Sequence, residues 1–397
     1  MTEASMQALV YDRARDPWDS SRGLRMERLP AVTLDEREDH NDRSRVLIRP
    51  HYAGFCGSDR GIWFRRAFKD MIFDSLDQEA KQAGQARDRR VIGHEVFGEV
   101  IAVGSDAERT YGLAVGDMVT AESHIFCGAC YQCRVGDAHV CADEYIIGIS
   151  TDGAFADYVK LPAKVIWRTD TKKIRPEVAA VQEPFGNAVH ACTKVNLRGK
   201  RIAIVGCGTI GLFAVAVARA LGATVIIGIE PNQNNAAMAR RLGADVVLTP
   251  AARAAEDYAH DPALAAEVRK LTDGVGVDVV LEMSGMNSSV NNAIHIVRRG
   301  GDVILFGLKS GDAIIESFDR VIVDGIAMHS VIGRRVWETW HITRHLLESR
   351  DPNIHDLIWE VMLNRGDGPV VDFESYTPDA FQERIQTFPK VVFRFPR

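Results

Sequence analysis

The fold is decided by residues 201–230, which read RIAIVGCGTIGLFAVAVARALGATVIIGIE. A short apolar run, 202–205, is followed by three glycines spaced as G-x-G-x-x-G and then by an apolar run of helical length, 209–221. A second β-type run, 225–229, closes the stretch. A strand, a glycine-rich turn, a helix and a further strand in this order are typical of a dinucleotide-binding unit. Because β-type and helical runs continue to alternate as far as residue 332, we predict an α/β protein with a doubly wound parallel sheet.

Each glycine of the motif has a predicted role at a dinucleotide site. Gly206 makes the tight turn, Gly208 lets a pyrophosphate approach the backbone, and Gly211 lets the helix pack closely on the strand. The N-terminus of the helix, at Thr209 and Ile210, then offers N–H groups and a positive dipole end to the phosphates.

Glu230 lies where an acid accepts the hydrogen bond of the ribose 2′-hydroxyl of NAD. Its charge would repel the 2′-phosphate of NADP, and residues 231–235 contain no Arg or Lys to bind that phosphate. We therefore expect NAD as the cofactor. A membrane span over the uncharged residues 202–218 is the alternative, and it is disfavoured because the run is short and interrupted by glycines.

Length and composition predict an ordinary globular protein of two domains or one elaborated domain. The chain has 397 residues, a net charge of −6 and no basic block, which argues against nucleic acid and membrane surfaces as partners. The N-terminal residues contain no secretory apolar stretch, so we expect a cytoplasmic protein. Seven cysteines in that compartment indicate metal binding or chemistry before disulfides.

Four of the cysteines form a C-x2-C-x2-C-x7-C pattern, made by Cys127, Cys130, Cys133 and Cys141. Four thiolates close a tetrahedral shell with no open position, so we expect a structural zinc. An iron–sulfur cluster is the alternative, since four thiolates also hold one. Zinc is favoured because the chemistry indicated by the glycine motif is hydride transfer and not electron transfer.

A second set of metal ligands lies upstream. Cys56 occurs in the stretch HYAGFCGSDR, and His94 and Glu95 occur in VIGHEVFGEVIAVG. Cys, His and Glu all bind zinc, and a catalytic zinc takes three protein ligands and keeps one position open. Each residue alone has an ordinary structural explanation, but their combination with a cofactor fold favours a catalytic metal.

These motifs together resemble the zinc-containing medium-chain dehydrogenase/reductase family of alcohol dehydrogenases, and the resemblance covers nearly the whole chain. It implies a β-rich GroES-like catalytic domain, a Rossmann cofactor domain, and two zinc ions per subunit, one catalytic and one structural. It also implies a homotetramer or homodimer. The expected catalytic domain is 1–183, with a zinc lobe at 124–142 and an insert at 60–91; the NAD-binding domain is 184–333, and 334–397 return to the catalytic domain.

The resemblance also implies roles for single residues. In the family, the catalytic zinc is held by the residues that match Cys56 and His94 and by a carboxylate, for which Glu95 and Glu183 are both candidates. The zinc lowers the pKa of an alcohol, so that an alkoxide forms near neutral pH and transfers hydride to the nicotinamide. The hydroxyl of Ser58 matches one that takes the substrate proton in relatives. Asp59 is placed to orient His94 or to act as a turn residue.

The substrate is indicated by the closer resemblance to the threonine dehydrogenase and sorbitol dehydrogenase branch. Residues 183–190 (EPFGNAVH), 282–285 (EMSG) and 333–340 (GRRVWETW) are similar to threonine dehydrogenase segments, and His124 matches a position near the substrate there. Against threonine stands Gly61, where that branch has a proton-relay histidine. The relay would then pass through another group, such as His51.

The insert at 60–91 lengthens the span between Cys56 and His94, and we predict a helical segment near the substrate mouth. Arg60 or Arg65 would bind an anionic or polyhydroxy substrate, or the segment would be an oligomer contact or a solvated helix. Three functions remain: a zinc dehydrogenase that transfers hydride from a small secondary alcohol such as L-threonine to NAD, a polyol or aldose dehydrogenase, and a non-catalytic NAD-binding protein. The third is disfavoured because every expected zinc ligand is present.

Overall fold

The computed structural model describes residues 5–254, 256–308, 311–351 and 353–396. It divides into two compact units, one made of Met1–Pro184 with Leu363–Arg397 and the other of Phe185–Met362. Residues 334–362 therefore group with the second unit, although the sequence analysis assigned them to the C-terminal return. The reason is packing, since α12 (Glu338–Glu348) contacts α13 (Ile354–Leu357), which in turn contacts α7 (Thr209–Ala220).

The second unit contains the predicted doubly wound sheet. Its six strands are parallel and follow the order β13-β12-β11-β14-β15-β16. Counted along the chain this is the order 3-2-1-4-5-6 of dinucleotide-binding folds, in which the order reverses between the first and fourth strands. The strands are β11 (Arg201–Val205), β12 (Val225–Ile229), β13 (Val246–Leu248), β14 (Val277–Glu282), β15 (Val297–Leu305) and β16 (Ala327–Ser330).

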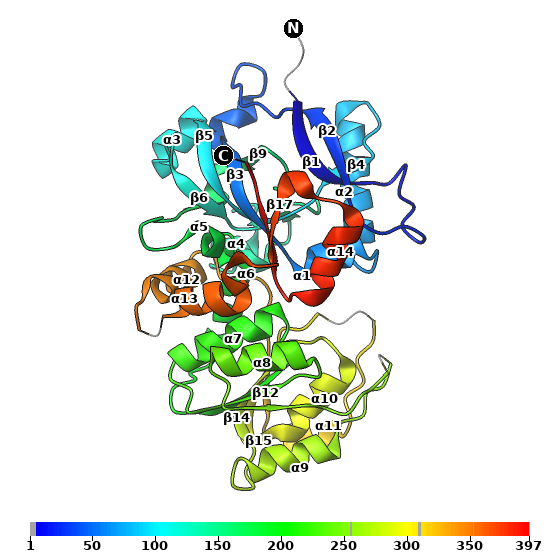
Figure 1. The fold of residues 1–397 in the computed structure, drawn as a ribbon, viewed down its shortest axis with the longest axis vertical. Coiled ribbons are helices and arrows are strands. Elements are labelled where there is room, and N and C mark those ends of the chain that lie inside the picture. The colour runs from blue at the N-terminus through cyan, green and yellow to red at the C-terminus, as the bar shows by residue number, and fades with distance from the viewer. Residues whose placement is uncertain (1–4, 255, 309–310, 352, 397) are drawn as a thin grey trace. The chain divides into compact units, whose positions relative to one another are not determined.

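Helices cover both faces of this sheet (Figure 1). The helices α7 and α8 (Gln233–Leu242) lie on one face, and α9 (Pro262–Lys270) and α10 (Asn287–Ile296) lie on the other. Residues 211–218 of α7 are all buried, which explains why this helix carries no charge before its last turn. A further helix of the unit, α11 (Phe318–Val323), precedes the edge strand β16.

The first unit is rich in β-structure, as expected. A seven-stranded sheet follows the order β10-β6-β5-β3-β18-β17, with β9 also paired to β3, and a three-stranded sheet follows the order β2-β1-β4. The larger sheet consists of β3 (Arg45–Phe55), β5 (Glu95–Val103), β6 (Met118–Ala121), β9 (Val159–Pro162), β10 (Ile166–Arg168), β17 (Val370–Asp372) and β18 (Val391–Arg394). The smaller one consists of β1 (Ser5–Asp12), β2 (Arg25–Pro30) and β4 (Arg89–Val91).

The first unit also contains helices and one small lobe. The helices are α1 (Gly57–Trp63), α2 (Lys69–Ala83), α3 (Ser105–Tyr111), α5 (Pro176–Ala179), α6 (Gln182–Thr193), which continues into the second unit, and α14 (Pro378–Thr387). The lobe is formed by β7 (His124–Ile125), α4 (Tyr131–Arg134) and β8 (Tyr145–Ile146).

The insert at 60–91 is helical, as predicted, and one side of it belongs to the core. Trp63, Ile72 and Leu76 are buried in a cluster that also contains aromatic side chains from both ends of the chain. Arg65 lies over the ring of Tyr11, with 4.6 Å between its guanidinium carbon and the ring centroid. The insert is therefore packed into the first unit and is not a helix that is solvated all round.

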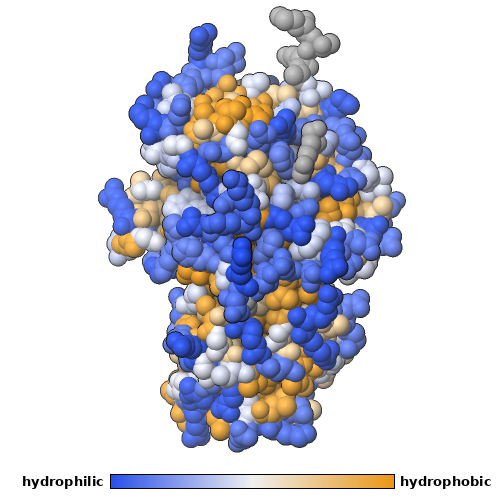
Figure 2. Space-filling model, turned by 60° about the vertical axis from the view of Figure 1, so that its left-hand side comes forward, coloured by the Kyte–Doolittle hydropathy of each residue, from blue (hydrophilic) through white to orange (hydrophobic). Residues whose placement is uncertain are grey.

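The surface is mostly hydrophilic. Charged and polar side chains cover most of the face shown in Figure 2, with apolar areas between them. Among the helices that the structure describes, none is long and apolar enough to cross a membrane. The membrane span considered for residues 202–218 is instead the buried β11 and most of α7.

Candidate metal and cofactor sites

The first unit brings Cys56, His94 and Glu95 together, with one ligand atom of each within 4.8 Å of the others. The sheet explains how. Strand β3 pairs antiparallel with β5, and Gly54 lies opposite Glu95. Cys56 follows the end of β3 and His94 precedes the start of β5, so both residues lie at the same end of this antiparallel pair of strands.

Glu95 is fully buried, and its environment fits a carboxylate that faces a cation. One of its oxygens, Oε2, forms an ion pair with the buried Lys390, whose ammonium also donates to the carbonyl oxygen of Phe55 at 3.1 Å. The other oxygen, Oε1, is buried without a hydrogen-bond partner among the described residues. Gly54 makes room for this side chain, because a Cβ atom there would collide with Oε2. A buried carboxylate oxygen without a hydrogen-bond partner is energetically costly, and a bound metal ion would remove that cost.

Glu183, the other carboxylate considered, lies outside this group of three. Its Oε1 accepts a hydrogen bond from the hydroxyl of Ser123 at 2.6 Å. Burial raises the pKa of Glu95, Lys390 acts against that rise, and the charge of Glu183 adds to it. The two carboxylates therefore interact, and Glu95 is the one that lies against Cys56 and His94.

His94 is held by two residues of α1. Its Nδ1 lies 3.4 Å from a carboxylate oxygen of Asp59, and its Nε2 lies 3.3 Å from the hydroxyl oxygen of Ser58. Asp59 is fully buried and also accepts a hydrogen bond from the Cys56 N–H at 2.8 Å. Burial alone would lower the pKa of His94, but the charges of Asp59 and Cys56 outweigh burial and raise it. A cation shared by the thiolate and the imidazole would take the place of that proton.

The four cysteines of the lobe also lie together, and all are free thiols. The sulfur atoms of Cys130 and Cys141 are 3.8 Å apart. Sulfurs bound at about 2.3 Å to a tetrahedral zinc are about 3.8 Å apart, whereas those of a disulfide are about 2 Å apart. A multi-iron cluster would bind its cysteines to different iron atoms and hold them more widely. The spacing therefore fits one zinc ion.

Backbone N–H groups prepare this lobe for a metal. The N–H groups of Ala129 and Cys130 point at the sulfur of Cys127, each at 3.3 Å. Hydrogen bonds from the backbone at Cys133 and Ala142 lower the pKa of Cys130 to about 6. Because the thiolate is the metal-binding form, these hydrogen bonds favour metal binding at Cys127 and Cys130. Burial raises the pKa of Cys133 and Cys141, and a bound metal would displace their protons.

The glycine motif of the second unit has the geometry that a dinucleotide needs. Gly206 has a positive φ of 90°, and a Cβ atom at Gly211 would collide with its carbonyl oxygen. A Cβ atom at Gly208 would meet nothing within 4 Å, so space is open there. Within the described residues, no side chain caps the N-terminus of α7, where Thr209 and Ile210 form the first turn. The loop thus fits a pyrophosphate.

Glu230 occupies the end of β12, as the sequence indicates, and it has a second role. Its two carboxylate oxygens accept hydrogen bonds from the N–H groups of Cys207, at 2.7 Å, and Asn232, at 2.8 Å. The acid therefore ties the glycine loop to the strand beside it. Each oxygen retains a further lone pair for a ribose hydroxyl.

Glu282 contributes to the cofactor edge of the sheet and was missed by sequence reasoning as a site residue. It is buried at the end of β14, and it accepts hydrogen bonds from the N–H groups of Ser284 and Gly285 and from the Ser284 hydroxyl. Burial raises its pKa. Ser284 in turn lies so close to Gly206 that a Cβ atom there would be 2.9 Å from its own Cβ. Glu282 thus fixes the turn beside the glycine loop.

The two predicted substrate residues have other partners. The Arg60 guanidinium donates to the carbonyl oxygens of Ile385 and Phe388 at the end of α14. The Nδ1 of His124 lies 3.3 Å from a carboxylate oxygen of Glu144. His51, considered for the proton relay, is 3.9 Å from Glu99 and lines a separate hollow beside β17.

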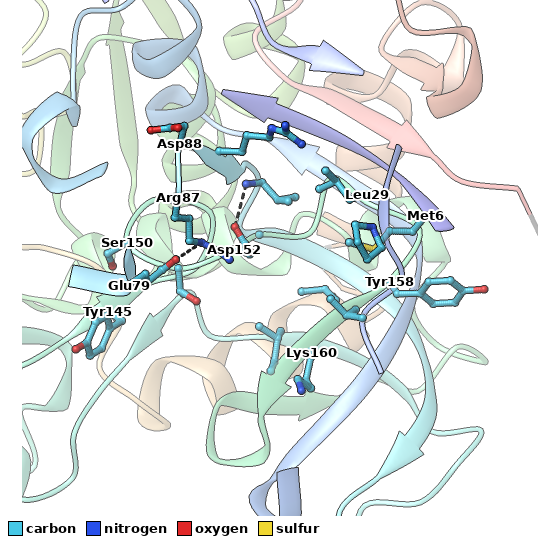
Figure 3. Close-up of a pocket in the computed structure, with 18 of the residues that line it drawn as sticks. Met6, Leu29, Glu79, Arg87, Asp88, Tyr145, Ser150, Asp152, Tyr158 and Lys160 are labelled. Carbon is cyan, nitrogen blue, oxygen red and sulfur yellow. Dashed lines mark hydrogen bonds and ion pairs between the residues drawn. The ribbon is translucent and has the colours of Figure 1, made fainter. Parts of the chain in front are cut away.

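A cavity of about 1030 Å³ lies beside the insert (Figure 3). Its lining residues include Glu79, Arg87 and Asp152, and Arg87 forms ion pairs with both acids. Cys56, His94 and Glu95 are not among the lining residues. The charges in this cavity are largely paired with one another, so it does not provide the catalytic site.

Comparison with known proteins gives consistent matches. Residues 42–171 match the alcohol dehydrogenase GroES-like domain, and residues 209–349 match the zinc-binding dehydrogenase family model. The chain is 38% identical to L-threonine 3-dehydrogenase of Pyrococcus furiosus, over 79% of this chain and 82% of that enzyme. It is 34% identical to L-threonine 3-dehydrogenase of Symbiobacterium thermophilum, over 84% and 86%. The solved 2R,3R-butanediol dehydrogenase of Bacillus subtilis has the same fold, with a TM-score of 0.75 at 22% identity over 99% of this chain and 100% of that one.

Proposed function

The chain belongs to the family of zinc-binding alcohol dehydrogenases, and on that premise we propose that it oxidises the secondary hydroxyl of L-threonine, or of a very similar small alcohol, with NAD as hydride acceptor. The observation that carries the proposal is the group of Cys56, His94 and Glu95, whose ligand atoms meet at one edge of the sheet. The choice of L-threonine is supported by relatives of that name at 34% and 38% identity.

Cys56, His94 and Glu95 would hold the catalytic zinc, and Glu183 is the further carboxylate within electrostatic reach. Bound zinc supplies a Lewis acid that lowers the pKa of the substrate hydroxyl. Asp59 holds the imidazole of His94 in one orientation, which keeps its other nitrogen available as a ligand. Lys390 balances the buried charge of Glu95.

Ser58 is proposed to accept the substrate proton while its own hydroxyl proton passes on towards solvent, because its hydroxyl oxygen lies 3.3 Å from Nε2 of His94, the nitrogen that would face the zinc. In the second unit, the open space at Gly208 and the first turn of α7 would bind the pyrophosphate, and Glu230 would bind the ribose. Bound NAD supplies the nicotinamide that accepts hydride. The carboxylate of Glu230 disfavours NADP by repulsion.

The test is NADH formation, followed by absorbance, with L-threonine, butanediol, sorbitol, xylitol and glucose offered separately. We expect turnover with L-threonine, its loss in a Cys56→Ala protein, and its retention in a Cys192→Ala protein, since Cys192 is fully buried and is not a member of any metal-ligand group of the described residues. Turnover with polyols or glucose alone would contradict the choice of substrate. NAD binding without turnover on any alcohol would contradict the enzymatic proposal.

We also propose that the enzyme is a homodimer or homotetramer in the cytoplasm. The edge strand β16 and the preceding α11 are supporting features, because Phe318, Ile322 and Val323 are 54%, 70% and 74% exposed. Exposed apolar side chains next to an unpaired strand edge are typical of a surface that another chain covers. The seven free cysteines fit a reducing compartment. Light scattering after size exclusion tests the oligomer, and Ile322→Asp should shift it towards monomer.

A further inference from the structure

A third group of potential metal ligands lies in the second unit, apart from both expected zinc sites. His260 precedes α9, His295 belongs to the last turn of α10, and Glu316 precedes α11. One ligand atom of each lies within 4.8 Å of the others. None of these residues belongs to the glycine loop or to the proposed catalytic machinery, so dehydrogenase chemistry does not account for their meeting.

Buried asparagines on α10 hold the two loops that carry the other ligands. The side chain of Asn291, which is fully buried, donates to the carbonyl oxygen of Tyr258 at 2.6 Å and accepts from the Glu316 N–H at 2.8 Å. Asn292 accepts from the Asp261 N–H at 2.7 Å. Since residues four apart share a helix face, Asn291 and His295 lie on the same side of α10. The three ligands are thus fixed by one helix.

The local contacts of the two imidazoles leave one nitrogen without a partner. The Nδ1 of His260 lies 2.7 Å from a carboxylate oxygen of Glu316. The rings of His260 and His295 are stacked, with centroids 3.6 Å apart and planes 2° from parallel. The Nε2 of His295 is buried without a hydrogen-bond partner among the described residues. A purely structural stack would not explain that buried and unsatisfied nitrogen.

The surrounding charges leave the group able to bind a cation. Three arginines lie nearby, but Arg253 is paired with Asp257, Arg320 with Asp324, and Arg269 donates to the His295 carbonyl oxygen.

We infer that His260, His295 and Glu316 form a third metal site, which binds a divalent transition ion of the zinc type and leaves one coordination position for water. Two imidazoles and one carboxylate suit zinc better than calcium or magnesium, which prefer oxygen ligands. Because the lone pairs of an imidazole lie in the ring plane, both rings would tilt out of their parallel stack to share one ion. The ion would fasten the loops before α9 and α11 to α10.

The test is equilibrium dialysis of the full-length enzyme against buffered free zinc, with zinc per chain measured by mass spectrometry. We expect the wild type to bind one zinc more per chain than His295→Gln or Glu316→Gln, and zinc to raise the melting temperature of the wild type more than that of these variants. His329→Gln is the matched control, since His329 is paired with Asp302 in the same unit and lies outside the group. It should behave as the wild type does.

Two further measurements keep the outcome decisive. Residue 316 is half-exposed, and Glu316→Gln retains the hydrogen bond from its backbone N–H to Asn291. This variant therefore tests the metal site even if His295→Gln fails to fold. NAD affinity and turnover without added metal should be unchanged in Glu316→Gln, because the site lies outside the catalytic groups. The inference would be overturned if wild type and Glu316→Gln bound the same amount of zinc per chain. It would also be overturned if His329→Gln lost as much zinc as Glu316→Gln does.

Discussion

Glu95 and Lys390 form a fully buried ion pair, although 295 positions separate them in the chain. The sheet order produces it. The end of β3 lies between the start of β5 and the start of β18, with Gly54 opposite Glu95 and Phe55 opposite Val391. Lys390 directly precedes β18, so the pairing of this last strand with β3 places its ammonium group at the carboxylate of Glu95.

Replacing Lys390 by Met should impair both stability and catalysis. Burial raises the pKa of Glu95 and Lys390 opposes this, so the variant would leave a carboxyl that binds a proton more readily than in the unfolded chain. A carboxyl with a raised pKa destabilises the folded state above its unfolded pKa, and this cost should grow without Lys390. Breaking a buried pair costs about 3–5 kcal/mol. Thermal unfolding from pH 5 to 8 and bound zinc per chain measure the effect.

Lys390→Arg is the control for this change, since it keeps a cation at the same place. We expect it to retain zinc and most of the activity. If Lys390→Met unfolded like the wild type at every pH, the ion pair would have no role in holding Glu95.

The cysteine lobe should lose its zinc as the pH falls, because protons compete with the metal for its four thiolates. Backbone hydrogen bonds lower the pKa of Cys130 to about 6, so its thiolate is present above that value and protons compete with the metal below it. A chromophoric zinc chelator would record the release. Cys130→Ser should release zinc at higher pH than the wild type, whereas Cys192→Ala should match the wild type, because Cys192 is fully buried elsewhere. Zinc retained at pH 4 would contradict the expectation.

Two glycines of one loop should respond differently to the same substitution. Gly208→Ala should fold normally because a Cβ atom there meets nothing within 4 Å. It should nevertheless weaken NAD binding by about tenfold, or roughly 1.4 kcal/mol, because the methyl group would occupy the space for the pyrophosphate. Fluorescence titration with NADH measures this.

Gly211→Ala, by contrast, should lower the melting temperature strongly, because its Cβ atom would collide with the Gly206 carbonyl oxygen. If wild type and Gly208→Ala bound NADH with equal affinity, the pyrophosphate would not bind at Gly208. Equal stability of the two alanine variants would show that the packing of α7 on the loop is not tight.

Arg60→Ala should reduce stability and leave the KM for the alcohol unchanged. The guanidinium satisfies the carbonyl oxygens of Ile385 and Phe388, and the loss of such a donor costs about 1–3 kcal/mol. Arg66→Ala is the matched control, since Arg66 is exposed in the same segment. A large rise in KM at unchanged stability would support the substrate role that the sequence suggested for Arg60.

Local pattern was enough to predict several parts of this protein. The glycine spacing before an apolar run predicts the β11–α7 turn, because glycine adopts the positive φ at Gly206 without strain and has no Cβ atom to collide at Gly211. The spacing of the lobe cysteines predicts one compact group, since so short a span must fold back on itself to bring four sulfurs together. The alternation of strands and helices predicts the parallel sheet.

Tertiary structure alone decided the contacts between distant segments. Lys390 reaches Glu95 only because β18 joins the sheet beside β3, and Arg60 meets α14 for the same kind of reason. His260, His295 and Glu316 lie in three separate segments with no common spacing, and they meet because α10 holds both loops. Short-range patterns record backbone conformation and which face is apolar, whereas the partner of a buried polar group depends on which strands and helices become neighbours.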